Sequence, residues 1–83
     1  MQVTVKYRSH LATLTKIAAE QIEAKTVKDI LQHIKTSFGT EAEKHAKAML
    51  VVVNGESILQ RALFKTVLQD GDEISFLPIC GGG

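Results

Sequence analysis

The feature that most limits the folds open to this chain is the apolar run MLVVV at 49–53, which is followed directly by Asn54-Gly55. The run is rich in valine, whose branched side chain favours strands. An apolar run without alternation is typical of a strand that is covered on both faces. Asn54 and Gly55 both tolerate positive φ, so they predict a hairpin turn into a returning strand that starts at 57–59.

The first third of the chain predicts a strand, a short helix and a second strand. Residues 2–7 alternate between apolar and polar side chains, which is the pattern of a half-buried strand. Ser9 is a candidate N-cap for a short helix over about 10–19. The segment 20–25 carries a weaker signal, and we expect it to form a second strand beside the first.

The clearest helix signal covers 27–38. Thr26 and Asp29 have the spacing of a capping box, and Gly39 is a typical stop. The polar segment 40–48 predicts a loop or one exposed helical turn. One face of the main helix is apolar and consists of Val27, Ile30, Leu31, Ile34 and Phe38.

The C-terminal part predicts a turn, a last strand and a tail. Asp70-Gly71-Asp72 is the turn, and the strand EISFLPI ends its regular pairing near Pro78, which has no N–H to donate. We therefore predict an α+β fold in which a mixed four- to five-stranded sheet curls around one main helix. Residues 1–80 would form a single domain, and the flexible tail 81–83 would leave from the edge of the sheet.

Composition narrows the classes of function. The net charge of +1 does not provide the positively charged surface that nucleic-acid binding needs. With one cysteine, neither an intramolecular disulfide nor a zinc knuckle is possible. The sequence has no apolar stretch of signal-peptide or transmembrane length. These features predict a soluble cytoplasmic protein that has neither nucleic acid nor a membrane as its partner.

Three sets of chemistry-bearing side chains have plain structural alternatives. Cys80 is either a reactive thiol or a tolerated small residue, and no basic neighbour in the sequence lowers its pKa. The histidines have no metal-ligand spacing, so no metal site is expected; they are His10, His33 and His45. A solvated turn explains the carboxylates better than acid–base catalysis does; they are Asp70, Asp72 and Glu73.

Several motifs together resemble the ubiquitin-like β-grasp sulfur carriers of the MoaD and ThiS type. They are the helix opening TV-x-D-[IL]-L, the valine-rich strand that ends in NGE, the turn L-x-DGDE, and the ending FLPI-x-GG. The helix at about 10–19 and the ending FLPICGGG are more similar to MoaD, the small subunit of molybdopterin synthase. One proline and three glycines stand where MoaD proteins often have two of each.

The resemblance implies a carrier and not a catalyst. In this family, an adenylating enzyme uses ATP to activate the C-terminal carboxylate, here that of Gly83, and a sulfur donor converts it to a thiocarboxylate. The carrier itself binds no cofactor. A MoaD-type carrier gives its sulfur to a pterin on the large subunit of molybdopterin synthase. The alternatives are a thiamine thiazole, a tRNA, or conjugation of the terminus to a lysine as a protein modifier.

The glycines suit this chemistry because a chain without side chains can enter a narrow pocket, where Gly81 and Gly82 would supply the reach. Ordering three residues costs about 3–6 kcal/mol of conformational free energy, which docking of the globular body must offset. The candidate docking residues are Phe76, Pro78, Ile79, Leu63 and Phe64. The alternatives are core packing for the two phenylalanines and, for the whole chain, a ubiquitin-shaped binding module whose glycines do nothing.

Overall fold

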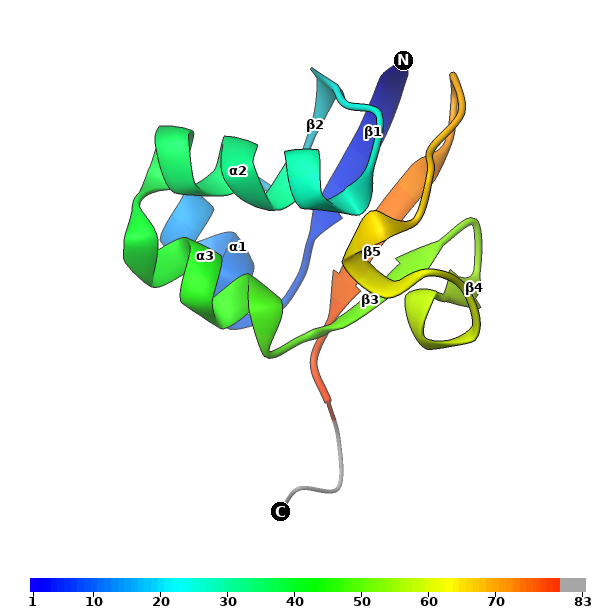
Figure 1. Ribbon diagram of the computed structural model, residues 1–83. Coiled ribbons are helices and arrows are strands. Elements are labelled where there is room, and N and C mark those ends of the chain that lie inside the picture. The colour runs from blue at the N-terminus through cyan, green and yellow to red at the C-terminus, as the bar shows by residue number, and fades with distance from the viewer. Residues whose placement is uncertain (80–83) are drawn as a thin grey trace.

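The computed structural model describes residues 1–79, which form a mixed five-stranded sheet with three helices gathered on one side of it (Figure 1). The strand order is β2-β1-β5-β3-β4, so the last strand lies in the middle. This arrangement confirms the predicted α+β fold with a mixed sheet. The strands are β1 Gln2–Tyr7, β2 Ala19–Glu23, β3 Leu50–Val53, β4 Glu56–Ser57 and β5 Glu73–Leu77.

The helices are α1 His10–Thr15, α2 Val27–Phe38 and α3 Thr40–Lys47, and two short 3₁₀ helices follow β4, η1 Ile58–Gln60 and η2 Leu63–Lys65. The predicted bounds of α2 are confirmed. The Thr26 hydroxyl accepts from the Asp29 N–H at 3.3 Å, and the Asp29 carboxylate accepts from the Thr26 N–H at 3.2 Å. This reciprocal capping box satisfies two N–H groups that a helix start leaves free.

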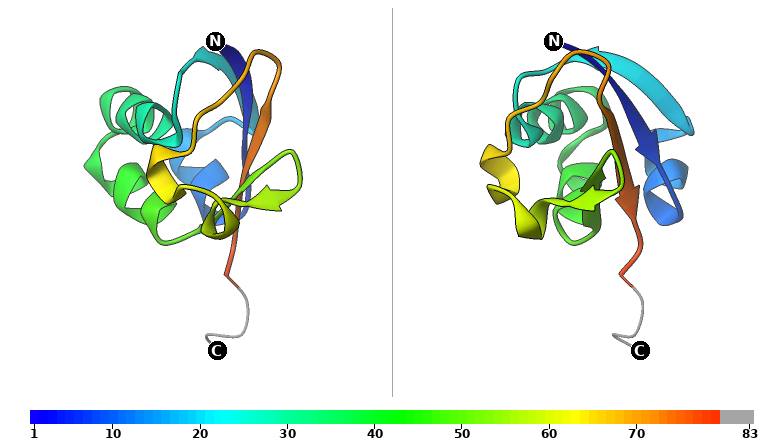
Figure 2. Two further views of the ribbon diagram at one scale, coloured as in Figure 1. Left: turned by 45° about the vertical axis from the view of Figure 1, so that its right-hand side comes forward. Right: turned by 90° about the vertical axis from the view of Figure 1, so that its right-hand side faces the viewer.

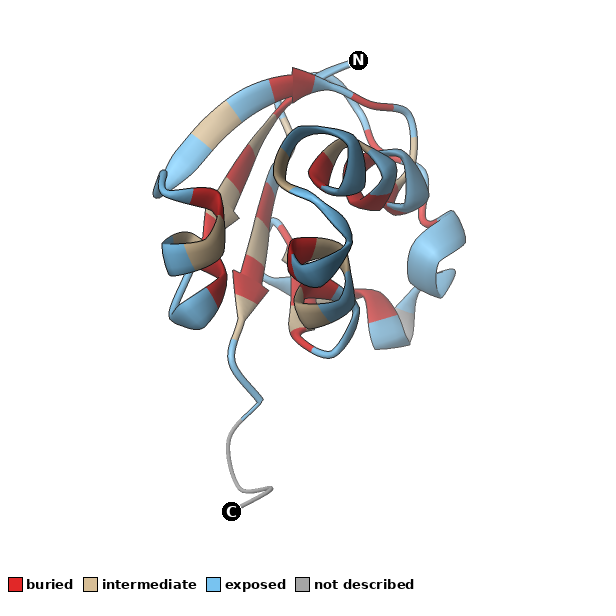
Figure 3. Ribbon diagram, turned by 90° about the vertical axis from the view of Figure 1, so that its left-hand side faces the viewer, coloured by how far each residue is buried: buried red, intermediate tan, exposed pale blue. Residues whose placement is uncertain are grey.

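The core lies between the sheet and the helices (Figure 3). In the register, Val5 pairs with Ile74 and Tyr7 pairs with Phe76. All four side chains are 0–1% exposed. Alternation with period two therefore places the odd residues of β1 and the even residues of β5 on the same buried face.

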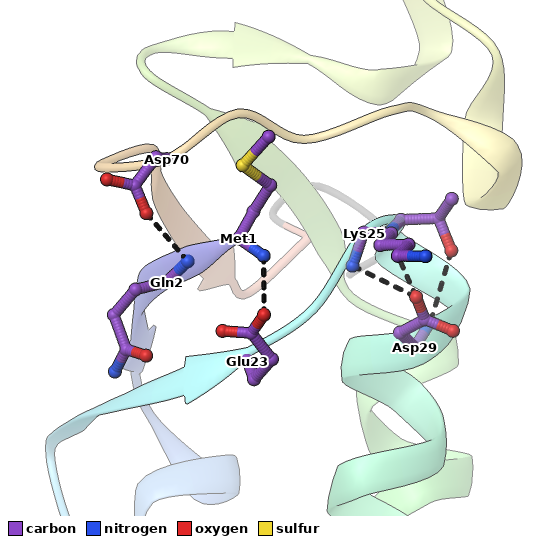
Figure 4. A network of polar contacts seen from close by, with 7 residues as sticks. Met1, Gln2, Glu23, Lys25, Asp29 and Asp70 are labelled. Carbon is purple, nitrogen blue, oxygen red and sulfur yellow. Dashed lines mark hydrogen bonds and ion pairs between the residues drawn. The ribbon is translucent and has the colours of Figure 1, made fainter.

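One group of polar contacts holds the N-terminal residues, and a separate group holds the start of α2 (Figure 4). The Gln2 N–H donates to the Asp70 carboxylate at 2.9 Å, and the terminal ammonium lies 2.7 Å from the Glu23 carboxylate. Asp29, besides capping α2, accepts from the Lys25 N–H at 3.0 Å. These contacts fix the entry into β1 and into α2, although the exposed ion pair itself contributes little stability.

The prediction that the strand at 49–53 is covered on both faces is wrong. β3 alternates between half-buried and buried residues, with Leu50 and Val52 half-buried and Val51 and Val53 buried. The cause is that the helices cover one side of the sheet only. Valine favours a strand at half-buried positions as well. The strand itself was therefore predicted correctly, and only the burial of its outer face was not.

The prediction of a loop or a single turn at 40–48 is also wrong. This segment is α3, which packs against α2, and its two inward residues Ala42 and Ala46 are 0–1% exposed. The two alanines are spaced i and i+4, so they share one face of the helix. Small side chains give a weak apolar signal in the sequence, yet they let the two helices approach closely.

The first helix is shorter than predicted, and Ser9 does not cap it. Ser9 has φ 57° and ψ −140° and makes no capping hydrogen bond. The helix stops at Thr15 because Lys16 adopts a left-handed conformation, with φ 65°. The Thr15 hydroxyl donates to the Ile17 carbonyl at 2.9 Å, which stabilises this exit. The predicted strand at 20–25 is confirmed as β2, antiparallel to β1.

The hairpin prediction is confirmed, but the returning strand is cut short. Asn54 and Gly55 have φ of 50° and 87°, as a primed turn requires. β4 ends at Ser57 because the Ser57 hydroxyl accepts from the Leu59 N–H at 3.1 Å and starts η1. The residues predicted as strand at 58–59 are therefore helical.

Candidate functional site

The prediction that the tail leaves from the edge of the sheet is wrong. The C-terminal segment follows β5, which lies in the middle of the sheet. β5 pairs with β1 on one side and with β3 on the other, and its pairing ends at Leu77, before Pro78. The root of the tail is therefore held by two neighbouring strands. The predictions for Cys80, Gly81, Gly82 and Gly83 lie outside the described residues.

An apolar hollow of about 210 Å³ lies beside this root. Its walls come from the end of α3, the start of β3, the two 3₁₀ helices and Ile79. Figure 2 shows η2, in yellow, lying beside α2 on the side of the sheet that the helices cover. Segments far apart in the sequence thus meet around the last described residue.

Four large apolar side chains of this hollow are exposed, and we call them the tail-root surface: Leu59, Leu63, Phe64 and Ile79. Their exposed fractions are 71%, 50%, 37% and 64%. Neighbouring exposed apolar residues on a small soluble protein are typical of a surface that a partner covers. The predicted docking residues Leu63, Phe64 and Ile79 are brought together here, and the exposed Pro78 precedes Ile79.

Phe76 does not belong to this surface. It is 0% exposed and stacks on the buried Tyr7, with 6.2 Å between ring centroids. The prediction of Phe76 as a docking residue is therefore wrong, and the alternative of core packing holds for it. The reason is the strand period, because Phe76 shares the inner face of β5 with Ile74.

Leu59 was not singled out from the sequence, although it is the most exposed residue of the tail-root surface. The sequence signal that could have found it is weak, since it is one leucine in a segment expected to form a strand. Its exposure arises because η1 turns the backbone and buries the preceding Ile58 instead.

Leu63 adopts a left-handed conformation, with φ 54°, which is costly for a branched apolar residue, at about 1–3 kcal/mol. Thr66, which is 1% exposed, holds this turn: its hydroxyl donates to the Leu63 carbonyl at 2.6 Å and its N–H donates to the same oxygen at 3.0 Å. The fold therefore stabilises a strained turn that presents an apolar side chain to solvent.

A second hollow of about 310 Å³ adjoins the first, and Phe64 lines both. Its walls are α2 and α3, with Lys28, Gln32 and Lys47 among its polar side chains. The Lys47 ammonium lies 3.8 Å from the Glu43 carboxylate, a long contact. The tail-root surface thus has a polar, lysine-bearing border on the helix side, as partner surfaces commonly have.

The carboxylates of the DGDE turn hold the backbone. The Asp72 carboxylate accepts from the Asn54 amide and from the Gln69 N–H, both at 2.9 Å. Both contacts hold the backbone of the turn, so they support the interpretation of these carboxylates as turn residues. Glu73 forms a 3.2 Å ion pair with Lys6 on the neighbouring strand.

A second polar cluster lies away from the tail root. The Tyr7 hydroxyl donates to Glu20 at 2.6 Å, and the same carboxylate oxygen lies 3.1 Å from the His33 Nε2. Burial and the Glu20 carboxylate raise the pKa of Tyr7 well above its ordinary value. This cluster ties β1, β2 and α2 together, and its role in the fold is structural.

Two further observations limit the chemistry. Among residues 1–79, no three histidine, cysteine, aspartate or glutamate side chains are grouped closely enough to hold a metal ion by themselves. Within the same residues, no helix has the length and apolar content needed to cross a membrane.

A mixed sheet that covers one main helix, with its C-terminal strand in the middle and an apolar surface at that strand's end, defines the class of ubiquitin-like β-grasp proteins. Within it, the family model of the ThiS family matches residues 5–83. The chain belongs to the ThiS family and is a ubiquitin-like sulfur carrier of the ThiS and MoaD type. No curated protein sequence matches it significantly.

Solved structures agree with this fold. The small archaeal modifier protein 1 (SAMP1) from Methanosarcina acetivorans has a TM-score of 0.84 at 23% identity, covering 99% of this chain and 96% of that one. Subunit 1 and 2 of the molybdopterin-converting factor from Helicobacter pylori form a complex that matches with a TM-score of 0.72 at 25% identity over the whole of both chains. The BexX/CysO complex from Amycolatopsis orientalis matches with a TM-score of 0.83 at 22% identity, covering 98% and 99%.

Proposed function

We propose that this chain is the sulfur-carrying small subunit of a molybdopterin synthase. The observation that carries the proposal is the family match, which runs to Gly83 and so includes the whole tail beyond the tail-root surface. The first helix after β1 and the likeness to a molybdopterin-converting factor subunit support this branch of the family. The protein would act in the cytoplasm and would contribute no catalytic side chain of its own.

The chemistry takes place at the Gly83 carboxylate. A carboxylate oxygen attacks the α-phosphorus of ATP in the adenylating partner, pyrophosphate leaves, and the acyl adenylate forms. Hydrosulfide released by the sulfur donor then attacks the acyl carbon, and AMP leaves with the electrons of the broken C–O bond. The thiocarboxylate that remains would pass its sulfur to a pterin on the large subunit. ATP and the sulfur donor therefore belong to the partners.

The tail-root surface would dock the body of the carrier on these partners. Ordering Gly81, Gly82 and Gly83 in a narrow pocket costs about 3–6 kcal/mol. Burial of exposed apolar area gains about 25 cal/mol per Å², so burying a few hundred Å² at this surface offsets that cost. Ile79, the last described residue, is part of this surface, so docking there would bring the tail to the partner.

The test is the intact mass of the protein after incubation with its adenylating enzyme, ATP and a sulfur source. The proposal predicts a gain equal to one oxygen replaced by sulfur, and no gain for a variant that lacks Gly82 and Gly83. The same truncated variant should fold normally and fail to support molybdopterin synthesis. An unchanged mass for the full chain under these conditions would contradict the carrier chemistry.

The second candidate is a protein modifier whose terminus joins lysine side chains. It is favoured by the TM-score of 0.84 to a small archaeal modifier protein. This function predicts a ladder of higher-mass conjugates in cell extract that disappears when the terminal glycines are removed. A thiocarboxylate without such conjugates would favour the molybdopterin pathway or another thio-product, such as the thiamine thiazole.

A further inference from the structure

Two histidines that are 35 positions apart in the sequence lie side by side in the fold. The His10 and His45 rings have centroids 5.0 Å apart and an angle of 69° between their planes. His10 begins α1 and His45 lies in the last turn of α3. Within residues 1–79, neither ring is hydrogen-bonded to another side chain, whereas His33 contacts Glu20.

The backbone behind both rings is held by the core. Leu11, which follows His10, and Ala46, which follows His45, are each 0% exposed. The two histidines therefore lie on helices that the core anchors, with His10 exposed and His45 half-buried. Ser9, directly before His10, has φ 57° and ψ −140°, a costly conformation for serine that sets the start of α1.

The separation of the rings suits a shared metal ion. An ion about 2.1 Å from one nitrogen of each ring, with tetrahedral angles, holds the two ring centroids about 5 Å apart. The observed separation is 5.0 Å with the rings edge to face, so the centroid distance matches this requirement and coordination would need the rings to turn. Neutral imidazole is a preferred ligand of Zn²⁺, Cu²⁺ and Ni²⁺.

We propose that His10 and His45 form a binding site for a divalent transition-metal ion of the zinc class. Because no third ligand side chain is grouped with them among residues 1–79, water completes the coordination shell. Such a site binds a labile, exchangeable ion. The ion joins α1 to α3, and Lys47, the last residue of α3, lines the hollow at the tail root.

The charged neighbours along both helices set the conditions for binding. On α3, Lys44 and Lys47 flank His45 and disfavour a cation, whereas Glu41 lies one helical turn before it and favours one. Arg8 precedes α1 and adds positive charge. Binding is therefore weak enough to be reversible.

The experiment titrates the full chain with zinc chloride in a Cys80→Ser background, which removes the one thiol that would compete. Isothermal titration calorimetry gives the dissociation constant, and NMR follows the ring protons of the histidines. We expect one ion per chain with micromolar affinity, and shifts in the signals of His10 and His45 together. His10→Ala and His45→Ala should each weaken binding by about tenfold or more.

His33→Gln is the matched control, because it removes a histidine outside the site and should leave zinc affinity unchanged. Circular dichroism confirms that each variant is folded, and His45→Gln replaces His45→Ala if the latter is not. No binding in the micromolar range overturns the proposal, as does a zinc affinity that His10→Ala or His45→Ala leaves unchanged. Zinc binding is measured without an adenylating enzyme or ATP. Failure of the metal-site proposal is therefore distinguishable from failure of the proposed function.

Discussion

Asn54 and Asp72 join the two turn motifs of the chain: the Asn54 amide nitrogen donates to the Asp72 carboxylate at 2.9 Å, across 18 residues of sequence. The Asn54 side-chain oxygen also accepts from the Glu73 N–H at 2.9 Å, and the Asn54 N–H donates to the Glu73 carbonyl at 2.8 Å. The NGE hairpin and the DGDE turn are therefore parts of one clamp that positions β5 beside β3.

This clamp predicts that Asn54→Ala destabilises the protein by about 1–3 kcal/mol, because it removes two side-chain hydrogen bonds and places alanine at a positive φ. Asn54→Gly is the matched variant, since it keeps the turn and loses only the hydrogen bonds. Urea unfolding should therefore rank the native chain above Asn54→Gly and Asn54→Gly above Asn54→Ala. Equal midpoints for all three would show that the clamp contributes nothing.

Asp72→Asn tests the carboxylate in the same clamp. It keeps one acceptor for the Asn54 amide and weakens the charge-assisted bond to the Gln69 N–H. We expect a loss of about 1 kcal/mol, and a double variant with Asn54→Gly that loses less than the sum of the two single changes. A double variant with additive losses would contradict a direct interaction.

Tyr7 predicts a loss of stability at alkaline pH. Its pKa is raised in the folded state by burial and by Glu20, so below about pH 10 the tyrosine is protonated in both states and the stability is complete. Above that pH the unfolded chain releases its proton first, and the free energy of unfolding falls as pH rises.

The measurement is urea unfolding at rising pH, with Tyr7→Phe as the control that should remove this contribution to the slope. Tyr7 is the one tyrosine of the chain, so the absorbance of phenolate reports on it alone. If the phenolate absorbance of the folded protein rises near the ordinary pKa of tyrosine, the prediction is contradicted.

The tail-root surface predicts that Leu63→Asp abolishes binding of the adenylating partner while the fold survives. Leu63 is 50% exposed and lines the hollow, so the change removes apolar contact and places a charge in the interface. Ile17→Asp is the matched control, because Ile17 is 37% exposed and does not line either hollow. Surface plasmon resonance should separate the two, and equal binding by both variants would place the docking surface elsewhere.

The hydrogen bonds of Thr66 to the Leu63 carbonyl lead us to expect that partner binding depends on the strained turn at Leu63. Thr66→Val removes a buried hydroxyl that holds the Leu63 carbonyl, which should cost about 1–2 kcal/mol. The freed turn should also weaken partner binding, whereas Thr15→Val, which changes a buried threonine that lines neither hollow, should cost stability alone. A Thr66→Val variant that binds with unchanged affinity would show that the turn is not needed for docking.

Sequence reasoning found the elements whose signals are local. The capping box at Thr26 and Asp29, the turn at Asn54-Gly55 and the strand period that buries Ile74 each depend on residues within one turn or strand. Local hydrogen bonds and backbone preferences act over a few positions, so the printed order of residues is enough to identify them. The terminal glycines and the two turn motifs also indicated the family, which the comparisons confirm.

The placement of these elements relative to one another was decided by tertiary structure. The sequence could not show that Phe76 is buried while Leu59 is exposed, because both depend on which side of the sheet the helices cover. It could not show that β5 lies between β1 and β3, or that His10 meets His45. Burial and contact are properties of segments brought together by the core, and a one-dimensional pattern does not contain those distances.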